Sequence, residues 1–167
     1  VIVCAEDGRV LPAGQRGEIR IRGPNTIAGY YKAPELTKKN FSGNGFWKSG
    51  DMGYMDEKGY LYLVDRKQDM IITGGYNVYA IEVENCLNSH PAIQNSAVVG
   101  LPHDLWGEEV CAMVMLVQGS TTSPAELIDH CKQHLARYKA PKKIEIIDRL
   151  PLSPAGKVLR REVRQLQ

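Results

Sequence analysis

Apolar and charged residues alternate along the first third of the chain, and turn residues separate the alternating runs. Residues 17–23 read Gly-Glu-Ile-Arg-Ile-Arg-Gly, a period of two that predicts a half-buried strand. The apolar runs at 52–55 and 60–64 flank Asp-Glu-Lys-Gly at 56–59, which predicts a hairpin whose short loop is closed by glycine. Residues 34–41 begin with proline, as many helices do, and predict a short helix. This part of the chain is therefore expected to be rich in strands.

Strand and helix patterns alternate beyond residue 65. A serine at 123, a proline at 124 and a glutamate at 126 combine a helix N-cap, a first helical residue and a capping box, so a helix is expected to start there and to end at Pro141. The other predicted elements are strands at 69–73, 93–101, 110–117 and 143–148, a helix at 80–89 and a basic helix at 158–166. The sequence thus predicts an α+β protein in which a β-rich remnant precedes a small α+β domain with a short sheet flanked by helices. The boundary is expected near residues 65–69, which leaves about a hundred residues for the second part.

Composition excludes several classes of protein. The 167 residues carry a formal net charge of +2, and the basic residues are dispersed, so a nucleic-acid partner is not expected. No secretion signal or membrane-length apolar run is apparent, and the four cysteines form no Cys-x-x-Cys pair, as is typical of a cytoplasmic protein. His130 and His134 lie four residues apart but lack a third ligand in the sequence, so no metal site is predicted. The chain begins without methionine, inside a strand pattern, and we interpret it as a piece of a longer protein.

An aspartate and an arginine stand at the two ends of the predicted hairpin. Asp51 follows Gly50, and a carboxylate presented at a turn can accept hydrogen bonds from both hydroxyls of a ribose. Alternatively, an aspartate at a turn can accept a hydrogen bond from its own backbone. Because a hairpin returns the chain to its starting end, Asp51 and Arg66 can meet over one ligand. The alternative is an ordinary surface salt bridge.

Two glycine-containing segments add further candidate chemistry. Gly74 and Gly75 follow a predicted strand, where they either allow a thin ligand or another backbone to approach closely or simply form a tight turn. Lys157 follows Pro154-Ala-Gly on a loop, and a cation presented in this way suits stabilisation of phosphate and carboxylate groups. A solvated surface lysine is the alternative, and the surrounding residues do not form a Walker A loop.

Several segments occur in the order in which the adenylate-forming superfamily has them. They are Gly17-Glu-Ile-Arg-Ile-Arg-Gly23 with Gly29-Tyr30-Tyr31, Lys48-Ser-Gly-Asp51, Asp65-Arg-Lys-Gln-Asp-Met-Ile with Gly74-Gly75, Val78 and Glu82-Val-Glu84, Leu135-Ala-Arg-Tyr138-Lys-Ala-Pro141, and Pro154-Ala-Gly-Lys157. The chain therefore resembles the C-terminal portion of an AMP-dependent acyl-CoA synthetase or ligase. The resemblance implies that residues 1–64 are the β-rich end of the large adenylation domain, residues 65–69 a hinge, and residues 70–167 the small lid domain of AMP-binding enzymes.

The resemblance also implies a reaction and roles for individual residues. ATP, with Mg²⁺, would activate a carboxylic acid to an acyl-adenylate with release of pyrophosphate, and CoA would then displace AMP to give a thioester. Asp51 would bind the ribose hydroxyls with help from Arg66, while Lys157 would bridge the substrate carboxylate and the phosphate. Gly74 and Gly75 would line the tunnel for the pantetheine arm of CoA.

The small domain would rotate between the two half-reactions. Gln68 stands at the hinge position, where the family usually has Asp or Lys, and this departure puts the chemistry of the hinge in doubt. Milder departures are Ser49 in place of threonine and Asp65 in place of glycine.

The expected function follows from this resemblance. We expect the C-terminal segment of an acyl-CoA synthetase for a fatty or aromatic acid. Its partners would be the acid, CoA and a missing N-terminal domain of the same chain, and a peripheral membrane contact is left open. The segment alone should be inactive, because the phosphate loop and the adenine and acyl pockets would precede it. The alternatives are an adenylation domain that loads a carrier protein and a non-catalytic module that binds a nucleotide or a partner.

Overall fold

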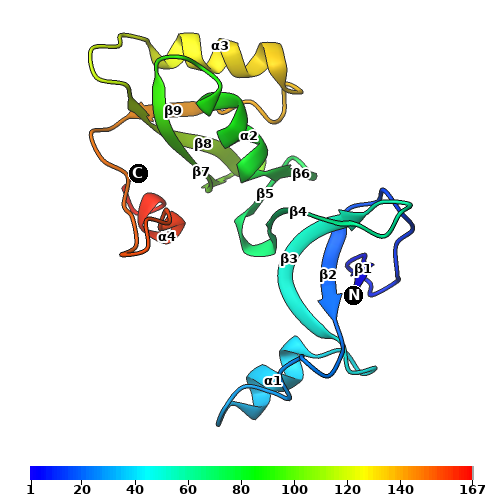
Figure 1. Cartoon of the computed structure of the whole chain (residues 1–167). Coiled ribbons are helices and arrows are strands. Elements are labelled where there is room, and N and C mark those ends of the chain that lie inside the picture. The colour runs from blue at the N-terminus through cyan, green and yellow to red at the C-terminus, as the bar shows by residue number, and fades with distance from the viewer. Residues whose placement is uncertain (167) are drawn as a thin grey trace. The chain divides into compact units, whose positions relative to one another are not determined.

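The computed structural model describes residues 1–166 and divides the chain into two compact units, Val1–Gln68 and a second that begins at Asp69. Each unit has its own β-sheet (Figure 1). The break between the units lies inside the range 65–69 in which the sequence predicts a boundary. The hinge role of this range stays a prediction.

The first unit is a four-stranded antiparallel sheet in which neighbouring strands follow one another along the chain. Its elements are β1 (Ile2–Cys4), β2 (Gly17–Ile21), α1 (Pro34–Asn40), β3 (Trp47–Met55) and β4 (Leu61–Arg66). The predicted hairpin is confirmed, because β3 pairs with β4 and the Asp56 N–H donates to the Tyr60 carbonyl at 3.0 Å across the turn. Ile19 and Met52 are buried in the core of this unit.

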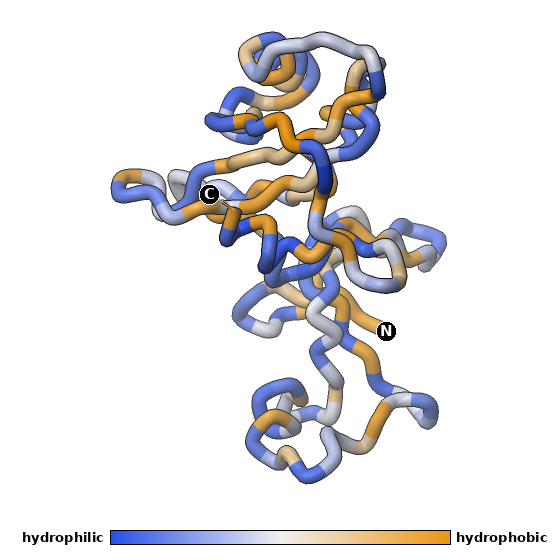
Figure 2. The backbone as a smooth tube through the Cα atoms, turned by 90° about the vertical axis from the view of Figure 1, so that its left-hand side faces the viewer, coloured by the Kyte–Doolittle hydropathy of each residue, from blue (hydrophilic) through white to orange (hydrophobic). Residues whose placement is uncertain are grey.

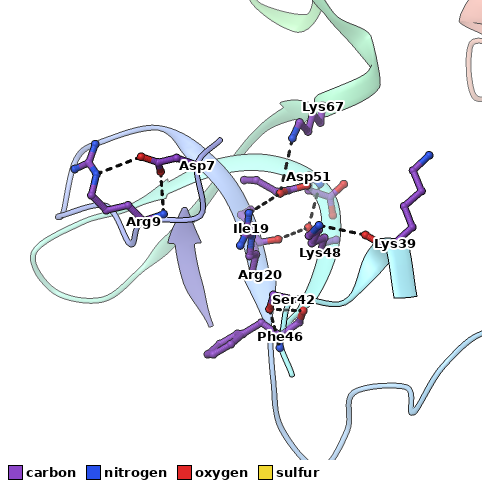
Figure 3. A network of polar contacts seen from close by, with 12 residues as sticks. Asp7, Arg9, Ile19, Arg20, Lys39, Ser42, Phe46, Lys48, Asp51 and Lys67 are labelled. Carbon is purple, nitrogen blue, oxygen red and sulfur yellow. Dashed lines mark hydrogen bonds and ion pairs between the residues drawn. The ribbon is translucent and has the colours of Figure 1, made fainter. Parts of the chain in front are cut away.

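The prediction of a half-buried strand at residues 17–23 is wrong in one respect. Glu18 and Arg20 on β2 are only 7% and 8% exposed, so the charged face of the strand is buried as well. Arg20 donates to the Glu18 carboxylate at 3.4 Å, and the Lys67 ammonium lies 3.9 Å from the same oxygen. Figure 3 shows Arg20 and Lys67 in this network. Burial is tolerated here because each charge has a partner of opposite sign.

The second unit is built on a five-stranded sheet of order β6-β5-β8-β7, with β9 added in parallel to β8. Its strands are β5 (Met70–Thr73), β6 (Tyr76–Tyr79), β7 (Ile93–His103), β8 (Gly107–Leu116) and β9 (Lys143–Ile146), and its helices are α2 (Ala80–Asn88), α3 (Pro124–His134) and α4 (Arg160–Val163). A short sheet flanked by helices was the expected fold, and the α+β class is confirmed.

Both faces of β7 and β8 are covered, which explains why these strands read as continuous apolar runs. Val98 and Val114 belong to a core that includes residues of α2 and α3. Val99 and Met113 point to the opposite face, where they pack with Val163 of α4. Successive side chains of a strand alternate between its faces, so one apolar run contributes residues to two cores. Figure 1 shows α2 and α3 on one side of this sheet and α4 on the other, and Figure 2 shows apolar stretches of backbone alternating with hydrophilic turns.

The predicted start of α3 is confirmed, and its predicted end is wrong. The Ser123 hydroxyl accepts the Glu126 N–H at 3.3 Å, and the Glu126 carboxylate accepts the Ser123 N–H at 2.7 Å, which forms a capping box. These hydrogen bonds hold the pKa of Glu126 below its ordinary value. The helix ends at His134 because Leu135 is already extended, well before Pro141.

One further local prediction needs correction, and one strand was missed. The basic helix expected at 158–166 is only the single turn Arg160–Val163, because Val158 pairs with Leu152 and the Leu159 N–H donates to the Pro151 carbonyl. Strand β6 was not predicted at all. No helix within residues 1–166 is both long and apolar enough to cross a membrane.

Candidate functional site

The register of β3 and β4 places Asp51 opposite Arg66. The Arg66 Nε atom lies 2.9 Å from Asp51 Oδ1, and the two side chains are 61% and 34% exposed. The hairpin therefore brings together the two residues that the sequence placed at its ends. One oxygen of the carboxylate contacts the guanidinium, and a carboxylate has further lone pairs for external hydroxyl donors.

The backbone before Asp51 is held by a serine hydroxyl. Ser49 Oγ donates to the Ile19 carbonyl at 2.8 Å and accepts the Asp51 N–H at 3.0 Å, so it ties β3 to β2 just ahead of the carboxylate. Lys48 turns away from this point and donates to the Lys39 carbonyl at 3.2 Å (Figure 3). Serine replaces the threonine of the resembled motif here, and these contacts need only the hydroxyl that both residues carry.

Lys157 lies at the end of a tight turn in the second unit. The Ser153 N–H donates to the Lys157 carbonyl at 2.8 Å, and the Lys157 N–H donates to the Ser153 hydroxyl at 3.1 Å. Gly156 has a φ of 76°, a left-handed conformation that glycine adopts without strain. Lys157 is exposed, and no acidic side chain of residues 1–166 forms an ion pair with it. Its ammonium is therefore available to an anion from outside this unit.

A buried ion network follows Lys157 directly, and the sequence analysis missed it. Arg160 donates from Nη2 to both oxygens of Glu84 at 2.8 and 2.7 Å, and from Nη1 to Asp69 Oδ2 at 3.3 Å. The side chains of Arg160, Asp69 and Glu84 are 20%, 10% and 8% exposed. Glu84 also accepts the Val98 N–H at 2.9 Å. The network thus ties the segment after Lys157 to α2, to β7 and to the first residue of the unit.

The sequence did contain a signal for this network. Glu84 shares the buried side of α2 with Ala80, Val83 and Leu87. An acidic residue on the apolar face of a helix requires a buried cation or donors, because an unpaired buried charge is too costly.

Gly74 and Gly75 form the two-residue turn between β5 and β6, where Thr73 pairs with Tyr76. Their φ values of 56° and 82° are both positive, as the favoured hairpin turns require. The Gly74 N–H donates to the Trp106 carbonyl at 2.9 Å, and a Cβ atom on Gly74 would come within 3.0 Å of the indole ring. Gly75 has open space at the corresponding position.

A pocket of about 140 Å³ adjoins this turn. It is lined by Thr73, Gly74, Tyr76, Trp106, Glu109, Tyr138 and Lys142. The rings of Tyr76 and Tyr138 stack with their centroids 4.6 Å apart. The sequence analysis named Tyr138 only as part of a motif and did not name Trp106, because their contribution to this pocket depends on strands and loops that meet only in the folded unit.

Gln68 is an exposed residue within the short 3₁₀ turn Lys67–Asp69. It is the last residue of the first unit, and its neighbour Asp69 begins the second. The position is consistent with a hinge, and the role itself stays a prediction.

Comparisons with known proteins cover nearly the whole chain. Residues 82–157 match the family model of the AMP-binding enzyme C-terminal domain. The chain is 42% identical over 161 residues to a 2-succinylbenzoate–CoA ligase of Bacillus cereus (strain Q1), an alignment that covers 96% of this chain and 33% of that protein. The structure of ATP-bound MatB from Rhodopseudomonas palustris matches with a TM-score of 0.93 and 39% identity, over 99% of this chain and 33% of that one. This chain belongs to the adenylate-forming superfamily.

Membership of the adenylate-forming superfamily confirms the resemblance found in the sequence motifs. The chain spans about a third of the length of the curated relatives it matches. The structure of the amide bond synthetase McbA from Marinactinospora thermotolerans also matches, with a TM-score of 0.90 and 40% identity, over 99% of this chain and 34% of that one. Relatives of similar identity thus include both a CoA ligase and an amide bond synthetase.

Proposed function

We propose that this chain is the C-terminal part of an acyl-CoA synthetase, which converts a carboxylic acid, ATP and CoA into acyl-CoA, AMP and pyrophosphate through an acyl-adenylate. One observation carries the proposal: the similarity to a named CoA ligase runs over 161 residues and so includes both the Asp51–Arg66 pair and the Lys157 turn. A domain missing from the N-terminal side would supply the phosphate loop and the acyl pocket. The same family membership supports ATP as the nucleotide, with Mg²⁺ as its counter-ion, and a cytoplasmic location.

The proposed roles follow from the charges. The Asp51 carboxylate accepts hydrogen bonds from the ribose hydroxyls, and Arg66 holds the carboxylate in place from the neighbouring strand. Lys157 offsets the repulsion between the substrate carboxylate and the α-phosphate, two anions that must approach each other for the first step. An ammonium without an ion-pair partner in its own unit suits this role, since no internal salt bridge has to break when it meets the two anions.

In the second half-reaction, the proposed role of the Gly74–Gly75 turn is to bind the pantetheine arm of CoA. Open space beside Gly75 and the adjoining pocket with Trp106 provide a narrow apolar surface of the kind that a pantetheine arm needs. We propose an aromatic carboxylic acid as the substrate, because the matched curated relatives are named for 2-succinylbenzoate. The fatty acid expected from the sequence has no support in these names.

A partial-reaction assay tests the proposal. The intact protein that contains this chain is incubated with ATP and a panel of acids that includes 2-succinylbenzoate, a medium-chain fatty acid and acetate, and pyrophosphate release is measured with and without CoA. We expect release and a CoA thioester with an aromatic acid, and no release from the 167-residue chain alone. Robust release by the isolated chain would contradict the division of roles between the two domains.

The acceptor is tested in the same assay. The amide bond synthetase relative makes an amine a second candidate acceptor, so one arm replaces CoA by a primary amine and another by a carrier protein bearing a pantetheine arm. Pyrophosphate release with product formed only on the carrier would favour the carrier-loading alternative. Nucleotide binding without any pyrophosphate release would favour a non-catalytic module.

A further inference from the structure

Two histidines and a cysteine converge where α2 packs against α3. His130 and His134 lie on one face of α3, with their ring centroids 4.4 Å apart. Cys86 of α2 faces them, and the ligand atoms of the three residues lie within 4.8 Å of one another. The sequence left the histidine pair without a third ligand, and the packing of the helices supplies one.

Hydrogen bonds select which nitrogen of each ring is free. His134 Nδ1 lies 2.8 Å from the His130 carbonyl, and a carbonyl only accepts, so Nδ1 carries the proton and Nε2 keeps its lone pair. His130 Nε2 lies 3.1 Å from the Cys86 carbonyl, so there the lone pair is on Nδ1. Contacts of this kind from a histidine N–H to a backbone carbonyl are the usual way in which proteins orient metal-binding imidazoles.

The cysteine adds a sulfur ligand to the two imidazole nitrogens, and this combination decides which metal ions the cluster can bind. Burial raises the pKa of the Cys86 thiol, so it is protonated until a cation displaces the proton. One thiolate and two imidazoles suit a borderline-soft divalent ion, above all Zn²⁺, and do not suit Mg²⁺ or Ca²⁺, which prefer oxygen ligands.

We propose that Cys86, His130 and His134 form a zinc-binding site with an open fourth position. Tetrahedral zinc bonds of ordinary length place ligand atoms about 3.3–3.7 Å apart. The three ligand atoms therefore have to close from within 4.8 Å by about 1 Å, which small changes in the side-chain torsions of the exposed His134 can supply.

His90 does not complete the site. Its ring lies edge-on to His130, with the centroids 5.1 Å apart. His90 Nδ1 accepts the Ala92 N–H at 3.3 Å, so the proton of the neutral ring is on its other nitrogen. Water or an external ligand occupies the fourth position, and the bound ion links α2 to α3.

The test measures metal binding by the 167-residue chain. Competition with a chromophoric chelator should give one Zn²⁺ per chain, and Co²⁺ should give a thiolate charge-transfer band. Cys86→Ser should abolish that band, and His134→Ala should weaken Zn²⁺ binding by more than about 100-fold, since even the loss of an outer partner costs 10–100-fold. His103→Ala is the matched control, because His103 lies on β7 beside Glu109, outside the cluster, and it should leave binding unchanged.

Thermal stability provides a readout that separates the site from adventitious binding. Zn²⁺ should raise the thermal unfolding midpoint of the parent chain but not of His134→Ala, whose exposed position lets it fold without metal. Parental affinity in both Cys86→Ser and His134→Ala, or a parent chain that binds no Zn²⁺, would overturn the proposal.

Discussion

The Asp51–Arg66 pair and the Lys157 turn present their charges in opposite ways. In the first unit two opposite charges lie on paired strands and neutralise each other at 2.9 Å. In the second unit a cation lies on an exposed turn without an acidic partner in the described part of the chain. In the proposed function the pair forms a ribose-binding surface that exists before any ligand arrives. The lysine is proposed instead to supply a solvated charge that pairs with an incoming anion.

The two regions also differ in what holds them. An ion pair as exposed as Asp51–Arg66 contributes about 0–1 kcal/mol, so the strand register positions these charges rather than their mutual attraction. Near Lys157 the order is reversed, because the buried charges of Arg160, Glu84 and Asp69 position the backbone. The hydrogen bonds between β3 and β4 position the Asp51–Arg66 pair, whereas a buried charge network positions the segment that follows Lys157.

The largest effect is expected from removing the centre of that network. Arg160→Ala leaves the carboxylates of Glu84 and Asp69 buried without their cation, so the free energy of unfolding should fall by about 3–5 kcal/mol. Urea denaturation measures this loss. The exposed neighbour Arg161→Ala is the control, with an expected change within about 0.5 kcal/mol. A loss of less than about 1 kcal/mol for Arg160→Ala would mean that the network does not hold this segment.

Lys157→Ala tests the lysine as a charge for the first half-reaction. In the intact enzyme, formation of the acyl-adenylate should fall about 10²–10³-fold, the usual cost of removing one stabilising group from a developing charge. Pyrophosphate exchange into ATP measures this step. Thioester formation from supplied acyl-adenylate should be nearly unchanged. Lys58→Ala, at the exposed turn of the first-unit hairpin, should affect neither step. Equal losses in both half-reactions would contradict the role.

Replacing one glycine in each unit, Gly59 or Gly75, compares the turns of the two units. Gly59 and Gly75 have φ values of 83° and 82°, and neither has an atom within 4 Å of where a Cβ would lie. Replacement by leucine therefore adds similar backbone strain at both positions, about 1–2 kcal/mol. Gly75→Leu should also slow thioester formation from acyl-adenylate and CoA about 10²-fold by displacing the thiol, whereas Gly59→Leu should not. If the two variants lose the same rate, the effect at Gly75 is strain alone.

The smallest change in stability is expected at Arg66. Because its pair with Asp51 is exposed, Arg66→Ala should lower the free energy of unfolding by less than about 1 kcal/mol. In the intact enzyme the KM for ATP should nevertheless rise about tenfold, the value of one hydrogen bond to a charged group. Arg9→Ala removes another surface pair, 3.9 Å from Asp7, and should change neither quantity. An unchanged KM in Arg66→Ala would remove this residue from the nucleotide site.

The sequence was a good guide wherever a structural feature depends on neighbours along the chain. The hairpin that joins Asp51 to Arg66, the Gly74–Gly75 turn and the capping box at Ser123 each rest on a few consecutive residues. The ordered motifs likewise identified the superfamily. Backbone preferences and hydrogen bonds of this kind act within one turn or one loop, so they can be read from local patterns.

Only the tertiary structure decided which distant groups meet. Arg160 reaches Asp69 across 91 positions of the chain, and the charged side chains of Glu18 and Arg20 are covered rather than exposed. The convergence of Cys86 with the two histidines of α3 likewise needed the packing of two helices. Burial and charge pairing depend on how elements pack, and the pattern of apolar and charged residues within one element does not say what covers each of its faces.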